Sequence, residues 1–438
     1  MNYREALSYL DDHVNLEARA GAIHGLSLDH MRALVGVLAD PQESFRVIQV
    51  TGTNGKGSTS RIITELLRAS GLTVGTYSSP HLQAVNERLA IDGEPISDEE
   101  FAAIVTAVAR VEPLSGIVPS YFELLTAAAF LWFAENAVDV AVVEVGLLGR
   151  YDATNVCAAD VAVVTNIGKD HTDGVGEWRY AIASEKAGII DPRSTLVSAV
   201  RESDLRAILE AEGPERSLFV DRDFEVVDDR PAIGGRVIDV VTPWGRLDEV
   251  IVPLHGLHQS ENALCAIAAV EAFFDRELDD AVVAEAMGRV TVPGRFEVVA
   301  HAPLLILDGA HNPDGARTLA ATLHAEFEIG GRLVLVLGML EGRDLHEMLT
   351  AFDVARADLV IATRPDSLRA VATDDLATMV RAMGVMVEVI DDVPTAVQRA
   401  IDVSTEDDAI VVSGSLYTVG AARTWLTTLV RDEERGGD

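Results

Sequence analysis

Residues Val50–Ser60 read VTGTNGKGSTS, a glycine-rich loop that carries one lysine and continues into hydroxyl side chains. The apolar run Phe45–Val50 before it predicts a strand, and Ser58–Ala69 after it predicts a helix. Such a loop directs backbone N–H groups at polyphosphate, while the lysine neutralises oxygens and the hydroxyl ligates Mg²⁺. The spacing departs from strict GxxxxGK[ST], because the stretch before Lys56 is shorter and a glycine follows the lysine. The alternative is a turn that only joins the two elements.

The rest of the chain alternates short β-branched runs with amphipathic stretches, which is typical of an α/β fold with a mainly parallel sheet. The runs Val138–Val145 and Asp160–Thr165 are almost wholly apolar, as expected for strands covered by helices on both faces. Residues 215–252 are turn-rich and polar, and we expect a small antiparallel excursion there. A Pro-Gly break within Val292–Phe296 separates a helical segment from a new strand series. We therefore expect two domains, which meet after residue 294.

The chain is strongly acidic: 35 Lys and Arg stand against 70 Asp and Glu in 438 residues, a formal net charge of −35. This charge argues against sequence-independent binding to nucleic acid or to an anionic membrane. Two distant cysteines without a CxxC pair argue against a disulfide scaffold and favour a reducing cytoplasm. Neither a signal peptide nor a membrane span is predicted. The acidity could reflect a saline habitat or genome composition.

The chain has three lysines, Lys56, Lys169 and Lys186, and its other 32 basic residues are arginine. Arginine cannot replace an ammonium that acts as a compact point charge or as a reactive amine. Each lysine is therefore a candidate functional residue, although Lys169 has no role that we can assign. Lys186 lies in SEKAGI on a predicted helix, where a solvated surface lysine is the plain alternative.

Polar side chains follow several predicted strands, where open parallel sheets bind ligands. Glu144 ends an apolar strand, and a buried carboxylate there needs a metal or a cationic partner such as arginine. His171, in TNIGKDHTD, is a candidate hard-metal ligand, or else a capping or core histidine. The segment LDGAHNPD carries Asp308 and His311 in a loop able to orient an amine or a phosphate, or in a plain turn. Arg295 and Asp308 could reach a nucleotide on the first domain if the two domains close.

A series of motifs in one order extends over essentially the whole chain. They are VTGTNGKGST, YSSPHL (77–82), NER (86–88), EVG (144–146), DATNV (152–156), DHT, EKAGI, HQ with Asn262, PGR, LDGAHNPDGA and SGSLY (413–417). The series closely resembles the folylpolyglutamate synthase/dihydrofolate synthase family, in its bifunctional bacterial type, within the ATP-dependent Mur ligases. This resemblance implies a P-loop ATPase domain at residues 1–294 and a smaller Rossmann-like domain of the glutamate-ligase type at residues 295–438.

The resemblance also implies the reaction. ATP phosphorylates a substrate carboxylate, L-glutamate attacks the acyl phosphate, and an amide, ADP and phosphate are released. The implied cofactors are ATP and Mg²⁺, and the implied acceptor is dihydropteroate or a reduced folate. We expect a monomeric cytoplasmic enzyme without nucleic acid or membrane partners. The alternatives are a Mur-type ligase with a different carboxylate acceptor and a nucleotide-binding switch without ligase activity.

Matched to these motifs, individual residues acquire implied roles. The implied nucleotide contacts are Thr53, Asn54, Gly55, Lys56, Gly57, Ser58, Asn262, Arg295 and Asp308. The implied Mg²⁺ ligands are Ser58, Ser79, Glu144 and His171, and the implied pterin contacts are Phe122, Asp152 and Ala153. His311 and Ser413 resemble positions that handle glutamate, and Lys186 matches a lysine that CO₂ carbamylates. Lys56, His311 and Lys186 are thus the implied catalytic residues.

One run departs from the family pattern. The usual Gly-Leu-Gly-Gly-Arg-Leu-Asp reads GLLGRYD at residues 146–152. Leu148 and Tyr151 therefore add bulk beside the implied pterin pocket, which affects the expected substrate preference more than the expected chemistry.

Overall fold

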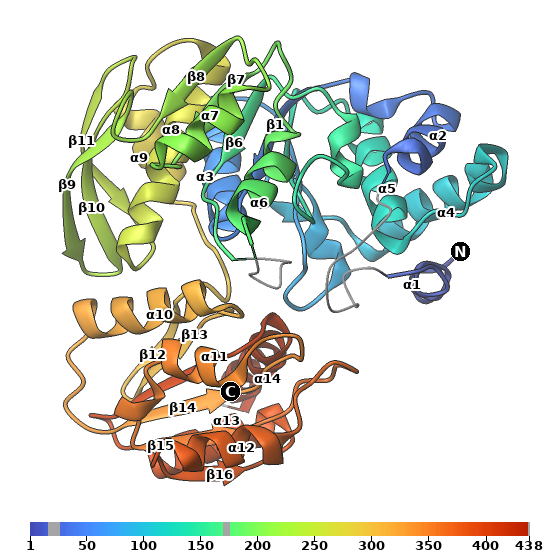
Figure 1. Cartoon of the computed structure of the whole chain (residues 1–438). Helices are drawn as coiled ribbons and strands as arrows, with labels where there is room; N and C mark the ends of the chain where they lie inside the picture. Colours follow the sequence, from blue (N-terminus) through green and yellow to red (C-terminus); the bar gives the residue numbers. More distant parts are fainter. Residues whose placement is uncertain (16–26, 170–175, 437–438) are drawn as a thin grey trace. The chain divides into compact units, whose positions relative to one another are not determined.

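The computed structural model describes residues 1–15, 27–169 and 176–436. The chain divides into two compact units, one of residues 1–253 with 257–291 and one of residues 254–256 with 292–438. The two units have separate sheets and separate helices (Figure 1). The change of unit at residues 291–292 lies close to the boundary expected after residue 294. Nothing in the sequence indicated that residues 254–256 pack with the second unit.

Within the described part of the first unit, eight strands form a sheet in the order β4-β3-β2-β5-β1-β6-β7-β8. The strands from β2 to β8 in this order are parallel, whereas β3 and β4 are antiparallel at one edge. Their bounds are β1 Arg46–Thr51, β2 Val74–Tyr77, β3 Leu89–Ile91, β4 Glu94–Pro95, β5 Val140–Glu144, β6 Val161–Val164, β7 Thr195–Ser198 and β8 Arg216–Phe219. The predicted mainly parallel α/β fold is confirmed.

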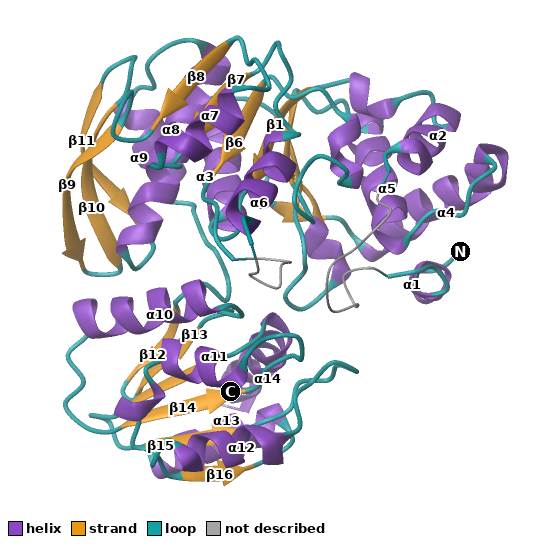
Figure 2. Ribbon diagram, viewed as in Figure 1, coloured by secondary structure: helices purple, strands orange, loops and turns teal. Residues whose placement is uncertain are grey.

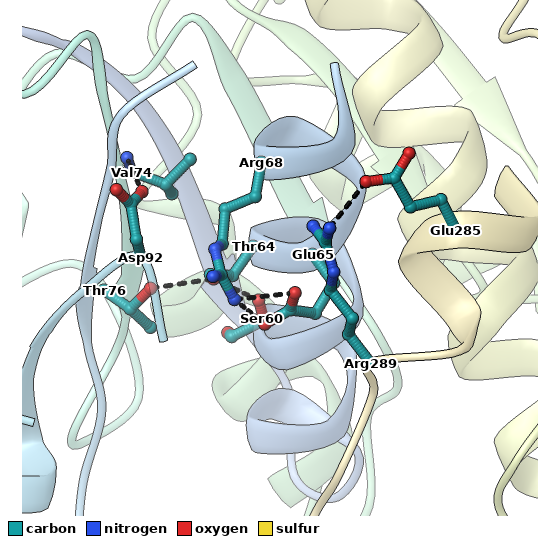
Figure 3. A network of polar contacts seen from close by, with 9 residues as sticks. All are labelled: Ser60, Thr64, Glu65, Arg68, Val74, Thr76, Asp92, Glu285 and Arg289. Carbon is teal, nitrogen blue, oxygen red and sulfur yellow. Dashed lines mark hydrogen bonds and ion pairs between the residues drawn. The ribbon is translucent and has the colours of Figure 1, made fainter. Parts of the chain in front are cut away.

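Helices cover both faces of this sheet (Figure 2). Thr76 of β2 and Thr64 of α3 join their hydroxyls at 2.7 Å, so α3 lies on the face to which Thr76 points (Figure 3). The neighbouring Tyr77 points to the opposite face, and there its ring packs on Phe122 of α5 with centroids 5.8 Å apart. The helices are α1 Tyr3–Asp11, α2 Asp29–Val37, α3 Lys56–Ala69, α4 Asp98–Ser115, α5 Tyr121–Glu135, α6 Trp178–Ala187, α7 Ser203–Glu210, α8 Leu257–Phe274 and α9 Asp280–Met287.

The antiparallel excursion expected at residues 215–252 is a separate small sheet over its later part. In the described residues, β9 (Glu225–Ala232), β10 (Gly235–Val241) and β11 (Arg246–Val252) pair in the order β11-β10-β9. The expectation was wrong for β8, which pairs parallel with β7 and extends the main sheet. Local alternation cannot distinguish these outcomes, because strand partners are chosen by tertiary packing.

The second unit has a sheet with the order β12-β13-β17-β14-β15-β16, counted over its described residues. Only β12 is antiparallel to its neighbour. The strands are β12 Glu297–His301, β13 Leu304–Leu307, β14 Leu333–Leu337, β15 Leu359–Ala362, β16 Val387–Val389 and β17 Ala409–Ser413. The helices are α10 Pro313–Glu326, α11 Leu345–Ala351, α12 Thr373–Ala382, α13 Val393–Val403 and α14 Leu416–Gly436. Across the described parts of both units, each helix is too short or too polar to cross a membrane.

Candidate functional site

The strand order of the first unit brings four chemically distinctive segments together at the carboxyl ends of the central strands. Strands β2, β5, β1 and β6 are consecutive and parallel, with Tyr77 beside Val143, Val50 beside Glu144, and Thr51 beside Val164. Their carboxyl ends therefore lie next to one another. At these ends lie Ser79 after β2, Glu144 as the last residue of β5, the glycine-rich loop after β1 and residues 165–169 after β6.

The glycine-rich loop ends in the first turn of α3. Gly55 precedes the helix with a φ of 85° and, being glycine, provides no side chain that could cap it. The first N–H donated within the helix is that of Thr59, to the carbonyl of Gly55 at 2.9 Å. The N–H groups of Gly55–Ser58 thus have no partner inside the helix, which is the arrangement that binds phosphate. Lys56 is the first helical residue, and its Nζ donates to the carbonyl of Gly52 at 3.1 Å.

Two residues after β6 hold this loop, and their function was missed in the sequence. The Asn166 Oδ1 accepts the N–H groups of Thr53 and Asn54 at 3.1 and 3.0 Å, and its Nδ2 donates to the Asn54 carbonyl at 3.0 Å. The Thr165 hydroxyl donates to the same carbonyl at 2.6 Å. Two of the N–H groups expected to bind phosphate are therefore used inside the protein. The signal available was the pair Thr-Asn directly after a buried strand.

Glu144 and Ser79, two of the implied Mg²⁺ ligands, lie together. Both are buried, and the N–H of Ser79 donates to Glu144 Oε2 at 3.4 Å. The same oxygen would lie 3.7 Å from a Cβ built on Gly57, so the carboxylate faces the first turn of α3, which also contains Ser58. The described residues contain no group of three His, Cys, Asp or Glu side chains that could hold a metal ion. His171 lies outside the described residues.

Asn262, an implied nucleotide contact, also touches the loop. It lies on α8, and its Oδ1 would be only 2.4 Å from a Cβ on Gly55. Its Nδ2 donates to Oε1 of Gln259, one turn earlier, at 2.9 Å. Gly55 must therefore be glycine both for its positive φ and for the close approach of Asn262.

Lys186 is buried near the end of α6, with 1% of its surface exposed. The alternative of a solvated surface lysine is therefore wrong. The loop after β5 packs on its backbone: a Cβ on Gly149 would lie 3.0 Å from the Cα of Lys186, and the Arg150 N–H donates to the Glu185 carbonyl at 2.7 Å. Helical periodicity does not show which face of a short helix a neighbouring loop covers.

The implied pterin contacts Phe122, Asp152 and Ala153 all lie buried next to this loop. Phe122 is 9% exposed, and its ring fills the space beside Gly146. Asp152 Oδ2 accepts the N–H of Leu147 at 2.7 Å, and Oδ1 accepts the N–H and hydroxyl of Thr154 at 3.0 and 2.5 Å. Burial raises the pKa of Asp152, and these hydrogen bonds oppose that shift. In this structure the three residues pack within or against the loop after β5.

The second unit gathers its implied site residues at the carboxyl ends of β13 and β17. Asp308 accepts the N–H groups of Phe296 and Ala310, both at 2.8 Å. Burial raises the pKa of Asp308, while the guanidinium of Arg295 opposes the shift. The Ser413 hydroxyl donates to the Asp308 carbonyl at 2.6 Å. His311 Nδ1 lies 2.9 Å from the Gly309 carbonyl.

Comparisons with known proteins show which families and solved structures this chain resembles. Residues 50–270 match the Mur ligase middle domain, and residues 294–416 match the Mur ligase glutamate ligase domain. The dihydrofolate synthase/folylpolyglutamate synthase of Mycobacterium tuberculosis is 39% identical, over 91% of this chain and 89% of that protein. A crystal structure of the M. tuberculosis folylpolyglutamate synthase with ADP and AMPPCP has a TM-score of 0.89 at 36% identity, covering 97% of this chain and 98% of that one. The bifunctional enzyme of Yersinia pestis, with AMPPNP and a Mn ion, has a TM-score of 0.85 at 30% identity, covering 98% of both chains.

Proposed function

Because this chain belongs to the Mur ligase family and, within it, to the dihydrofolate synthases and folylpolyglutamate synthases, we propose that it joins L-glutamate to a pteroate or folate carboxyl group with ATP. The observation that carries the proposal is the first turn of α3, whose N–H groups lie beside the buried carboxylate of Glu144. We propose that these N–H groups bind phosphate and that Glu144, which faces the same turn of α3, is a metal ligand. We assign ATP binding to residues 1–294, glutamate ligation to residues 295–438, and the reaction to the cytoplasm.

The chemistry must bring an anionic carboxylate to an anionic phosphate. A carboxylate oxygen of the acceptor attacks the γ-phosphorus of ATP, the bond to ADP breaks, and an acyl phosphate forms. The amine of L-glutamate then attacks the acyl carbon and loses a proton, and the C–O bond to phosphate breaks. In a chain of net charge −35, Lys56 and the helix N–H groups supply local positive potential where the phosphates bind.

The oxygen ligands at this edge suit a hard divalent cation. Ser58, Ser79 and Glu144 offer two hydroxyls and a carboxylate, the donor types that Mg²⁺ takes together with waters and phosphates. Bound Mg²⁺ would neutralise charge on the phosphates. His171 completes the proposed set. Thr53 to Ser58 with Asn262 remain the proposed nucleotide contacts of the first unit, although the N–H groups of Thr53 and Asn54 already donate to Asn166.

The remaining residues keep the roles that their motifs imply. Lys186 is proposed to be carbamylated, because conversion of a buried ammonium to a carboxylate turns a group that repels cations into one that binds them. Phe122, Asp152 and Ala153 are proposed to shape the pterin pocket. In the second unit, Arg295 and Asp308 are proposed to contact nucleotide, and His311 and Ser413 to receive glutamate.

The test is ADP release by the purified chain with Mg-ATP and L-glutamate, with and without dihydropteroate or tetrahydrofolate. We expect release to require both an acceptor and glutamate, and to be lost in Lys56→Ala and Lys56→Arg, since a planar guanidinium does not replace the ammonium. Stimulation only by some other carboxylate would identify a different Mur-type ligase. Nucleotide binding without any acceptor-dependent release would contradict the proposal.

A further inference from the structure

The loop that we propose binds triphosphate is held by the segment that follows the neighbouring strand β6. Asn166, the second residue after β6, contacts two consecutive loop residues with both ends of its amide. Because its oxygen faces two N–H groups and its nitrogen faces a carbonyl, the orientation of the amide follows from its partners. Thr165 adds a second hydrogen bond to the Asn54 carbonyl.

The contacts concentrate on Asn54. Thr53 has other support, since its N–H also donates to the Asn166 carbonyl at 3.2 Å and its hydroxyl accepts the N–H of Gly168 at 2.9 Å. For Asn54, the side chain of Asn166 takes the N–H and holds the carbonyl. Asn54 directly precedes Gly55, which occupies the position just before the first residue of α3. The backbone conformation of Asn54, which these hydrogen bonds hold, thus determines the position of the N–H groups at the start of α3.

We infer that Asn166 is a positioning residue for nucleotide binding: its amide fixes Asn54 so that the N–H groups of Gly55–Ser58 present a preformed phosphate site. This inference rests on the proposed binding of ATP by the loop. The Asn166 oxygen already serves two N–H groups, so the amide acts on nucleotide through the loop. Preorganisation of this kind increases affinity by removing the cost of ordering the loop during binding.

The experiment measures binding of AMPPNP and ADP with Mg²⁺ by calorimetry, so its result is separate from catalysis. Asn166→Ala should weaken both nucleotides by about tenfold, the change that corresponds to about 1.4 kcal/mol. Asn166→Asp keeps the shape but loses the donor to Asn54 and adds negative charge beside the phosphate site. It should weaken AMPPNP, the more highly charged nucleotide, more than ADP.

Two substitutions of Thr165 test the hydroxyl separately from the packing of the side chain. Thr165→Val removes the donor to the Asn54 carbonyl and should also weaken nucleotide binding, by a few-fold. Thr165→Ser retains that donor and should bind nucleotide as the parent does. A role limited to packing would instead make the valine variant the milder one, because valine keeps the volume of threonine.

Asp160 is the matched control at the other end of the same two strands. Its Oδ2 accepts the N–H of Val47 in β1 at 2.9 Å, and its Oδ1 pairs with Arg46 at 2.9 Å. Asp160→Ala should lower the melting temperature without changing nucleotide affinity. The inference is overturned if Asn166→Ala binds AMPPNP as tightly as the parent, or if Asp160→Ala weakens binding equally. The parent chain could show these affinity changes in its variants and still release no ADP when an acceptor is added. That result would reject the proposed reaction and leave the inference standing.

Discussion

Gly52 offers the sharpest test of how the phosphate loop is built. It leaves β1 with a φ of 152°, a conformation that essentially only glycine adopts. A Cβ at this position would lie 1.8 Å from Thr165 Oγ1, 3.1 Å from Thr165 Cβ and 3.3 Å from the backbone nitrogen of Asn166. Gly52→Ala therefore introduces both backbone strain and a collision with the residues that clamp the loop.

The two costs can be estimated separately. Holding a non-glycine residue in such a region costs on the order of 1–3 kcal/mol, and overpacking a filled site costs about 1–3 kcal/mol more. We expect Gly52→Ala to lose about 2–6 kcal/mol of unfolding free energy. Urea denaturation measures this loss, and calorimetry with AMPPNP measures the accompanying loss of affinity.

A double-mutant cycle separates strain from collision. Thr165→Ala removes the hydroxyl at 1.8 Å but leaves its Cβ at 3.1 Å and does not change the backbone of Gly52. The double variant should recover about 1 kcal/mol or more relative to the sum of the single changes. The description of this contact is wrong if the unfolding free energy of Gly52→Ala lies within about 0.5 kcal/mol of that of the parent. It is also wrong if the effects of Gly52→Ala and Thr165→Ala on the unfolding free energy simply add.

Three further changes test other parts of the molecule. Lys186→Ala should lose most activity while keeping ATP affinity, and short carboxylic acids should restore part of it; parent-like rates would remove the carbamate proposal. Glu144→Gln should raise the Mg²⁺ concentration needed for half-maximal activity by tenfold or more, since an amide is a weaker ligand; an unchanged requirement would exclude Glu144 as a ligand. Burial raises the pKa of Glu271 above its ordinary 4.5, so its ionised form is disfavoured in the fold, and its contribution to stability is lost as pH rises between the ordinary and raised values. Glu271→Gln should therefore gain stability relative to the parent across that interval, as melting temperatures from pH 4 to 8 would show, and a constant difference would contradict this.

Local pattern predicted the elements around the site well. The expected strand Phe45–Val50 is β1, shifted by one residue, and the expected helix Ser58–Ala69 is α3, which begins two residues earlier at Lys56. The resemblance to the folylpolyglutamate synthase/dihydrofolate synthase family is also confirmed. Motifs of this kind can be recognised in a sequence because catalysis requires particular residue types at fixed spacing along the chain.

Contacts between segments were not predictable in the same way. The partnership of Asn166 with Asn54 joins residues 112 positions apart. The backbone of the buried Lys186 is likewise packed against Gly149, in a loop far from it along the chain. Asp152, expected to face a ligand, uses both carboxylate oxygens to hold its own loop. Such contacts depend on which strands become neighbours.

The amino-acid sequence by itself determined the α/β character, the phosphate loop and the family, because periodicity and motif spacing are properties of the chain taken locally. Tertiary structure alone decided that β2, β5, β1 and β6 are neighbours, and hence that Ser79 contacts Glu144 and that Asn166 holds the glycine-rich loop. The physical reason is that strand order is chosen by the burial of whole faces and the handedness of crossovers, which act on complete elements rather than on single residues.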